Sequence, residues 1–150
     1  MVATKKTLRH RALDLLAMRE HSQFELQKKL LQKGFGATEV DDLIESLRIE
    51  GLLCDQRFAE SYVRYRAQTG HGPIKIRAEL HQRGISAALA DQAIDASDID
   101  WWQCLTEVWD KKYAHLAASM DRKMKEKCMR FLYQRGFDST MITKVLADEI

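Results

Sequence analysis

The chain of 150 residues is 45% hydrophobic and 31% charged, so it is globular and long enough for one domain or a short array of small units. Its three cysteines lie far apart and form no C-x-x-C pair, which argues against a disulfide framework or a zinc site and predicts reduced, buried thiols. A net charge of +2 argues against a strongly basic nucleic-acid binder. No apolar stretch approaches the roughly 20 residues that cross a bilayer, which predicts a cytoplasmic protein without membrane contact.

The first third of the chain predicts three helices. An apolar stripe with helical spacing lies within residues 8–16 and indicates the first helix. Ser22 and Glu25 form a capping box, so a second helix is expected from about residue 23 to Lys33. Apolar residues at helical spacing within residues 40–44 predict a third helix.

One phrase, x-Gln-Lys/Arg-Gly-apolar, closes the second of these helices and recurs twice. It occupies residues 31–35, 81–85 and 133–137, with its glycines 50 and then 52 residues apart. A cation in a last helical turn complements the helix dipole, glycine takes the left-handed conformation, and the next apolar residue packs back on the helix. The phrase therefore predicts a helix end in each of three repeats, because a fixed period of this length is typical of repeat architectures.

The second repeat is predicted to open with Asp55 as the N-cap of a helix whose apolar stripe contains Phe58, Tyr62 and Tyr65. Residues 70–73 read Gly-His-Gly-Pro and break the chain, and the proline suits the first turn of the next helix. The tyrosines fit the apolar stripe, so we interpret them as core residues and not as stacking platforms.

The third repeat is predicted to open with a tryptophan-rich stripe within residues 101–109, also interpreted as core. A longer connection is expected near residues 115–119. Ser86 and Asp138 are the predicted N-caps of the last helices of the second and third repeats.

These elements predict an all-α fold. No stretch shows the sustained alternation of a strand. The predicted architecture has three tandem three-helix repeats, residues 1–53, 54–99 and 100–150, stacked into one elongated, curved array. One unit of this size buries too little apolar surface to be stable alone, so contact with its neighbours is expected to supply the rest.

No catalytic pattern stands out. The five histidines show no H-E-x-x-H or other metal-ligand spacing, and none accompanies a recognisable nucleophile signature. The glycines around His71 lack the preceding strand and the G-K-[ST] ending of a phosphate-binding loop. We therefore expect a binding protein that is not an enzyme and needs no cofactor or metal.

Basic residues gather in the second and third repeats. Six cations and two acids lie within residues 57–83, and eight cations and two acids within residues 111–135. The candidate partner-binding residues are cations that share helical faces in these segments: Arg57, Arg64, Arg66, Lys75, Arg77, Arg83, Lys123, Lys127 and Arg130. The same faces could serve only solubility, and the dipole of a helix end is sufficient reason for Arg83. The partner could be a phosphate backbone or an acidic protein groove.

Several motifs in order carry a family resemblance. They are Ser22-x-x-Glu25-Leu26, Lys33-Gly34-Phe35, Gly51-Leu52-Leu53, Asp55-Gln56-Arg57-Phe58-Ala59, Gly70-His71-Gly72-Pro73 and Ile76-Arg77-x-Glu79-Leu80. Together, over about residues 8–95, they resemble the RecX family of recombination regulators. The third repeat is similar in layout but less distinctive, and Cys54 stands where that family leads us to expect an acid.

The resemblance implies a regulator of DNA repair and recombination, including the SOS response. Such a protein binds the RecA recombinase and the RecA filament on DNA, lies in the helical groove of the filament, and inhibits the ATPase, recombinase and co-protease activities of RecA. A monomer with weak single- or double-stranded DNA contact is expected. The alternative from the residues themselves is a helical protein that binds DNA directly, without a RecA partner.

Overall fold

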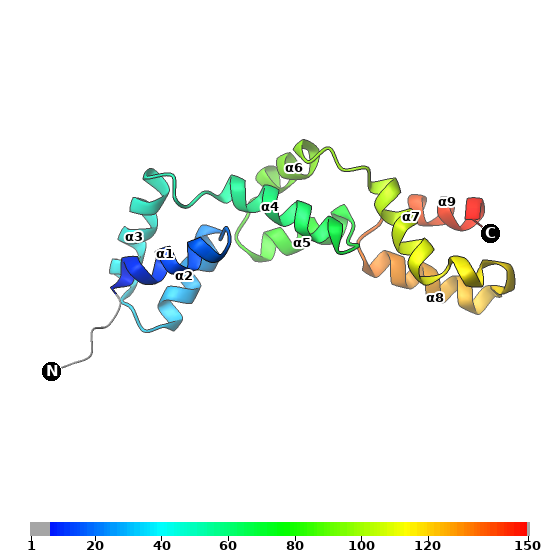
Figure 1. Cartoon of the computed structure of the whole chain (residues 1–150), viewed down its shortest axis with the longest axis horizontal. Helices are drawn as coiled ribbons and strands as arrows, with labels where there is room; N and C mark the ends of the chain where they lie inside the picture. The colour runs from blue at the N-terminus through cyan, green and yellow to red at the C-terminus, as the bar shows by residue number, and fades with distance from the viewer. Residues whose placement is uncertain (1–6, 150) are drawn as a thin grey trace.

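The structure, a computed structural model, describes residues 7–149, and every regular element in that range is helical (Figure 1). The first repeat comprises α1 (Leu8–Met18), α2 (Gln23–Gln32) and α3 (Ala37–Ile49). The second comprises α4 (Asp55–Gln68), α5 (Pro73–Gln82) and α6 (Ala87–Ala96). The third comprises α7 (Trp101–Lys112), the short 3₁₀ helix η1 (Ala114–Ser119), α8 (Arg122–Gln134) and α9 (Ser139–Glu149).

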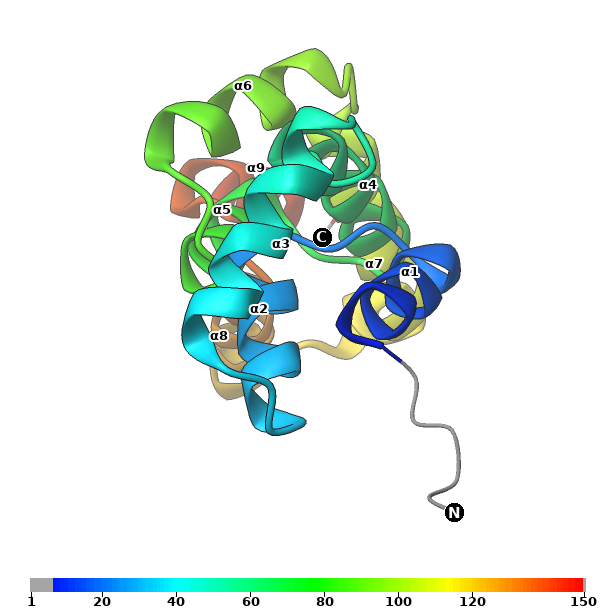
Figure 2. The same ribbon diagram turned by 90° about the vertical axis from the view of Figure 1, so that its left-hand side faces the viewer.

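The all-α fold of three tandem three-helix repeats is therefore confirmed. The repeats follow one another along the long axis of an elongated, curved array, with α1 and α9 toward opposite ends of the molecule (Figure 1). The view along that axis shows the three repeats behind one another (Figure 2). The predicted repeat limits, 1–53, 54–99 and 100–150, stay predictions, and residues 1–6 and 150 lie outside the described residues.

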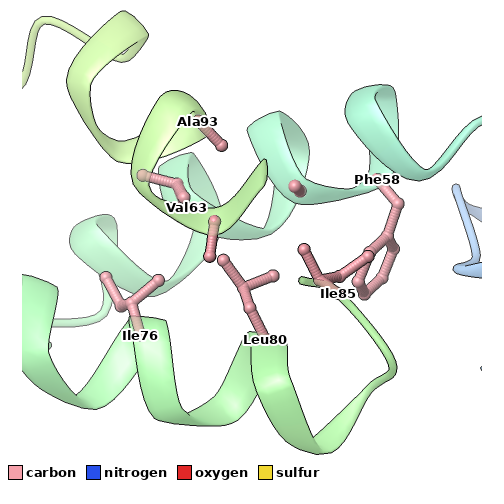
Figure 3. Close-up of a cluster of buried hydrophobic side chains, with 8 residues drawn as sticks. Phe58, Val63, Ile76, Leu80, Ile85 and Ala93 are labelled. Atoms are coloured by element: carbon pink, nitrogen blue, oxygen red, sulfur yellow. The ribbon is translucent and has the colours of Figure 1, made fainter. Parts of the chain in front are cut away.

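Each repeat has a hydrophobic core of its own. In the second repeat, Phe58 and Val63 of α4 meet Ile76 and Leu80 of α5 beneath α6 (Figure 3). Leu26 and Leu30 of the first repeat and Trp109 and Leu132 of the third are likewise fully buried in separate clusters. Burial of one such side chain contributes about 1.5–3 kcal/mol. Three small cores, joined end to end, explain why the molecule is long and not compact.

Most predicted helix starts are confirmed, and one is wrong. Ser22 Oγ accepts a hydrogen bond from Glu25 N at 3.0 Å while the Glu25 carboxylate accepts one from Ser22 N, which completes the capping box. Ser86 caps α6, and Asp138 Oδ1 accepts from Met141 N at 2.8 Å at the start of α9. The N-cap of α4 is Cys54, and Asp55 is the first helical residue.

Asp55 has another task, which explains the error. Its Oδ1 accepts a hydrogen bond from the backbone N–H of Gln23 at 2.8 Å, across the boundary between the first two repeats. Sequence reasoning assigned the carboxylate to its own helix because local capping is the commoner use of an aspartate after a turn.

The structure also corrects the predicted burial of one tyrosine and two cysteines. Tyr65 is 59% exposed, so it does not belong to the core stripe of α4, whereas Tyr62 packs against that core. All three cysteines are free, but only Cys128 is buried, and Cys54 and Cys104 are partly exposed. Burial raises the pKa of the Cys128 thiol to about 11.

A backbone contact joins the second repeat to the third. The N–H groups of Gly72 and Ile74, at the start of α5, donate to the carbonyl oxygens of Arg135 and Gly136 at 2.7 and 3.1 Å. The N-terminal end of one helix thereby meets the C-terminal end of another, and their dipoles attract. A methyl group on Gly136 would lie 2.4 Å from Lys75 Cβ, so the contact requires glycine there.

The first and second repeats meet in an equivalent way. Ser22 Oγ, at the start of α2, donates to the Arg83 carbonyl oxygen at 2.7 Å. Phe24 covers Gly84 so closely that a methyl group on this glycine would lie 2.5 Å from Phe24 Cβ. In both junctions, the turn that starts the middle helix of one repeat docks on the turn that ends the middle helix of the next.

Candidate partner-binding surfaces

The nine cations that the sequence suggested for partner binding fall into two groups. Four of them bind carboxylates of this chain: Arg57, Arg66, Arg77 and Arg83. The side chains of the other five make no hydrogen bond or ion pair to other described residues: Arg64, Lys75, Lys123, Lys127 and Arg130. The first group contributes to the fold, and most of the second is available to a partner.

Arg66 is largely enclosed. Its guanidinium donates two hydrogen bonds to the Glu79 carboxylate, at 2.9 and 3.0 Å, and both side chains are about four-fifths buried. Tyr62 donates a third bond to Glu79 at 3.0 Å. Burial tends to raise the pKa of Glu79, but the hydrogen bonds from Arg66 and Tyr62 outweigh it, and this pKa lies below its ordinary value. The pair joins α4 to α5 inside the second repeat.

Replacement of Arg66 by glutamine is therefore expected to lower the free energy of unfolding by about 1–3 kcal/mol, because a largely buried carboxylate loses its charged donor. Arg64→Gln, two residues away on the exposed side of the same helix, is the matched control and should change stability by less than about 0.5 kcal/mol. Urea unfolding of both variants measures the difference. Equal effects would show that the Arg66–Glu79 pair adds nothing to the fold.

Arg57 and Arg83 act at the junction of the first two repeats. Arg57 Nε lies 3.3 Å from both carboxylate oxygens of Glu20, and its Nη2 donates to the Gly51 carbonyl oxygen at 2.8 Å. Arg83 Nε lies 3.7 Å from Glu25, and its guanidinium carbon lies 4.8 Å from the centre of the Tyr62 ring. Both side chains thus bridge repeats, so a partner would have to compete for them.

Arg77 and Lys75 sit on α5. Arg77 donates to Asp91 of α6 at 2.7 Å, and this exposed pair lies within the second repeat. Lys75 is partly buried because its Cβ packs against Gly136 of the third repeat. Lys75 is therefore only partly available to another molecule.

Three of the four remaining cations form one exposed positive surface. Lys123, Lys127 and Arg130 lie at helical spacing on the exposed side of α8, and we call them the α8 basic face. The opposite side of α8 buries Cys128 and Leu132 in the third core. Since burial fixes the rotation of α8, the three cations are held outward together, as the sequence predicted.

A cleft at the junction of the second and third repeats was not predicted. It has a volume of about 480 Å³ and lies between the end of α4 and helices α7 and α8. Lys111, Lys112 and Arg135 line it together with Glu107, and Lys112 Nζ lies 3.7 Å from the centre of the Phe131 ring. Its cations can attract a carboxylate or a phosphate. Sequence reasoning counted these cations but could not bring α4 beside them, because that requires the docking of two repeats.

His21 is a buried titratable group at the first junction. It is 1% exposed, with Nδ1 3.0 Å from the Arg19 carbonyl oxygen and Nε2 2.9 Å from Lys29 Nζ. A carbonyl oxygen only accepts and an ammonium only donates, so the ring is neutral with its proton on Nδ1. Burial lowers the pKa of His21, and the charges of Arg19 and Lys29 lower it further.

Acidification from about pH 7.5 to about pH 5 is expected to destabilise the wild-type chain more than the His21→Gln variant. In the unfolded chain the His21 imidazole takes up a proton near pH 6.5, whereas in the folded chain it does so only at lower pH. The stability that is present above pH 6.5 is therefore lost as the pH falls through the pKa of His21 in the folded chain. Urea unfolding at both pH values measures this change in the free energy of unfolding. His10→Gln is the control, because His10 is an exposed residue of α1. The same pH dependence in wild type and His21→Gln would contradict the assignment.

The described residues contain no group of three or more histidine, cysteine or acidic side chains that could hold a metal ion. Within the same range, no helix is long and apolar enough to span a membrane.

Known proteins resemble this chain along nearly its whole length. Models for the first, second and third three-helix domains of RecX match residues 9–47, 55–94 and 98–146. Regulatory protein RecX of Pseudomonas savastanoi pv. phaseolicola is 42% identical over 144 residues, which cover 96% of this chain and 92% of that protein. Regulatory protein RecX of Ectopseudomonas mendocina is 41% identical over 146 residues and covers 97% of each chain.

A solved structure agrees with the fold. The crystal structure of RecX from Lactobacillus salivarius matches with a TM-score of 0.77 over 95% of this chain and 94% of that one, at 23% identity. The three domain models match the three repeats one by one, and the two relatives extend over almost the entire sequence. This chain therefore belongs to the RecX family of regulatory proteins.

Proposed function

We propose that this chain regulates the RecA recombinase: it binds RecA and RecA–DNA filaments and inhibits the ATPase, recombinase and co-protease activities in DNA repair and recombination. The observation that carries the proposal is the near-full-length match to proteins named Regulatory protein RecX, in all three repeats. In this proposal the chain is a cytoplasmic monomer that acts by binding and catalyses no reaction.

The shape of the molecule supports a filament as the partner. Three repeats in line offer contact points at several positions along one axis, and a filament presents identical subunits at regular intervals. Several modest contacts along one array then add up, because each contact after the first is intramolecular.

Inhibition follows if the array binds one arrangement of the filament better than another. A ligand can shift an equilibrium only by its difference in affinity for the two states. A chain that contacts neighbouring RecA subunits at once favours the subunit spacing that fits its own repeats, and we propose that this spacing is not the active one.

The test is RecA ATPase activity on single-stranded DNA, titrated with this protein, together with co-sedimentation of the protein with filaments. The expected result is a dose-dependent fall in hydrolysis and recovery of the protein in the filament pellet. Unchanged hydrolysis and a protein that stays in the supernatant would refute the proposal.

Direct DNA binding is the second candidate, and the α8 basic face favours it. Lys123, Lys127 and Arg130 are exposed and unpaired among the described residues, so they are free to neutralise phosphates. If DNA binding were the main activity, affinity for naked DNA would be high and would fall steeply with salt, without RecA. Under the RecA proposal, binding to naked DNA is weak at physiological salt and strengthens when RecA is added.

A further inference from the structure

Both junctions use one pair of complementary turns. The donor turn is the N-cap of a middle helix and the residue two positions later: Ser22 and Phe24 in the first repeat, Gly72 and Ile74 in the second. The acceptor turn is the glycine that ends a middle helix, with its two neighbours: residues 83–85 in the second repeat and 135–137 in the third. Each donor turn hydrogen-bonds to a carbonyl oxygen of the next acceptor turn and covers its glycine.

The first repeat has an acceptor turn that no other described residue occupies. Lys33, Gly34 and Phe35 reproduce the sequence, and Gly34 has the same left-handed conformation, with φ at +94°. A methyl group on Gly34 would meet no atom within 4 Å among the described residues, whereas on Gly84 and Gly136 it would meet the preceding repeat at 2.5 and 2.4 Å.

Two further observations show that this turn lacks a neighbour within residues 7–149. The carbonyl oxygens of Lys33 and Gly34 accept no hydrogen bond within residues 7–149, while their counterparts Arg83 and Gly136 do. Phe35 is only partly buried, but the equivalent residues Ile85 and Phe137 are 1% and 0% exposed. The helix C-terminus, the partly exposed ring of Phe35 and the open space over the glycine form one surface.

A second copy of this chain does not fit that surface. Its free donor turn would be that of the third repeat, where the N-cap of α8 is Asp121 and the residue two positions later is Lys123. Phe24 and Ile74, the residues that Lys123 would replace, are apolar. A lysine in this place replaces an apolar side chain by a charged one and adds a positive charge to a turn that already carries exposed Lys33, and like charges repel. Head-to-tail growth of the array by identical copies is therefore disfavoured.

We infer that the acceptor turn of the first repeat docks the first turn of a helix on a RecA subunit. The matching helix start has a small or hydroxyl-bearing N-cap and an apolar residue two positions later, as in the two donor turns of this chain. Exposed Lys33 belongs to the site and favours a first turn with aspartate or glutamate, which helix N-termini commonly carry. This inference rests on the proposed regulation of RecA.

The test compares two glycine variants in the RecA ATPase titration. Gly34→Ala puts a methyl group into the space that the partner helix would fill. Gly51→Ala is the matched control, because Gly51 also has a positive φ, +78°, and nothing within 4 Å of an added methyl group. We expect Gly34→Ala to lose at least about tenfold in inhibitory potency and Gly51→Ala to inhibit like wild type.

The outcomes separate the two proposals. If wild type does not inhibit RecA, the proposed function fails. If wild type inhibits and Gly34→Ala inhibits equally well, only the docking site is wrong, and equal losses in the two glycine variants also overturn it, since backbone strain then suffices. Hydrogen exchange of the unaltered chain is an independent measurement: filament binding should protect a peptide over residues 31–37 more than one over 48–53, and equal protection contradicts the inference.

Discussion

Gly136→Ala is expected to detach the third repeat from the second. An added methyl group would lie 2.4 Å from Lys75 Cβ and 2.6 Å from Lys75 N, distances that no small side-chain movement relieves. Gly136 also has a φ of +100°, where a residue with a Cβ is strained by about 1–3 kcal/mol. Separation of the backbones then removes two hydrogen bonds, each worth about 0.5–1.5 kcal/mol. The free energy of unfolding should fall by at least about 3 kcal/mol.

Urea unfolding followed by tryptophan fluorescence measures this loss of stability in the third repeat. All three tryptophans, Trp101, Trp102 and Trp109, belong to α7 of the third repeat. Gly34→Ala is the control: it carries the same kind of backbone strain without a clash and should cost about 1 kcal/mol. If the two variants unfold at the same urea concentration, the junction does not depend on close approach at Gly136.

Charge reversal of the α8 basic face is expected to weaken RecA inhibition at least about tenfold, or about 1.4 kcal/mol of binding free energy. The variant combines Lys123→Glu, Lys127→Glu and Arg130→Glu. Because the three side chains are exposed and unpaired among the described residues, the helical content and the unfolding transition should stay close to wild type. The ATPase titration at low and physiological salt measures the loss, since screening weakens exposed charges.

A variant that keeps the charges is the control for this experiment. Lys123→Arg, Lys127→Arg and Arg130→Lys together retain three cations and should inhibit nearly like wild type. Arg64→Glu, on the exposed side of α4, tests separately whether the second repeat contributes. Wild-type inhibition by the α8 reversal variant would remove this face from the proposed binding surface.

Local sequence chemistry was enough to predict the secondary structure and the repeat. The capping box at Ser22, the N-caps Ser86 and Asp138, the proline that opens α5 and the glycines that end the middle helices all act on backbone within a few residues. Helix starts and stops depend on such short-range hydrogen bonds and dihedral angles, so they can be inferred from the sequence without the fold.

Local reasoning failed where a side chain serves a neighbouring repeat. Asp55 looks like a helix cap, but it holds the N–H of Gln23 in the preceding repeat. Arg57 and Arg83 look like a positive surface, but their partners Glu20 and Glu25 lie in the first repeat. No spacing rule within one repeat identifies these pairs, because the two partners lie in different repeats and meet only when those repeats dock.

The repeated glycine shows both kinds of information at once. The sequence by itself determined that Gly34, Gly84 and Gly136 end helices, because only glycine adopts a positive φ without strain. Only the tertiary structure decided that two of them are also contact points, at which the backbone of one repeat touches the next, and that no other described residue covers Gly34. The physical reason is that a positive φ is a property of the glycine residue itself. The absence of a side chain on that glycine, in contrast, matters only where another segment of the chain fills the space.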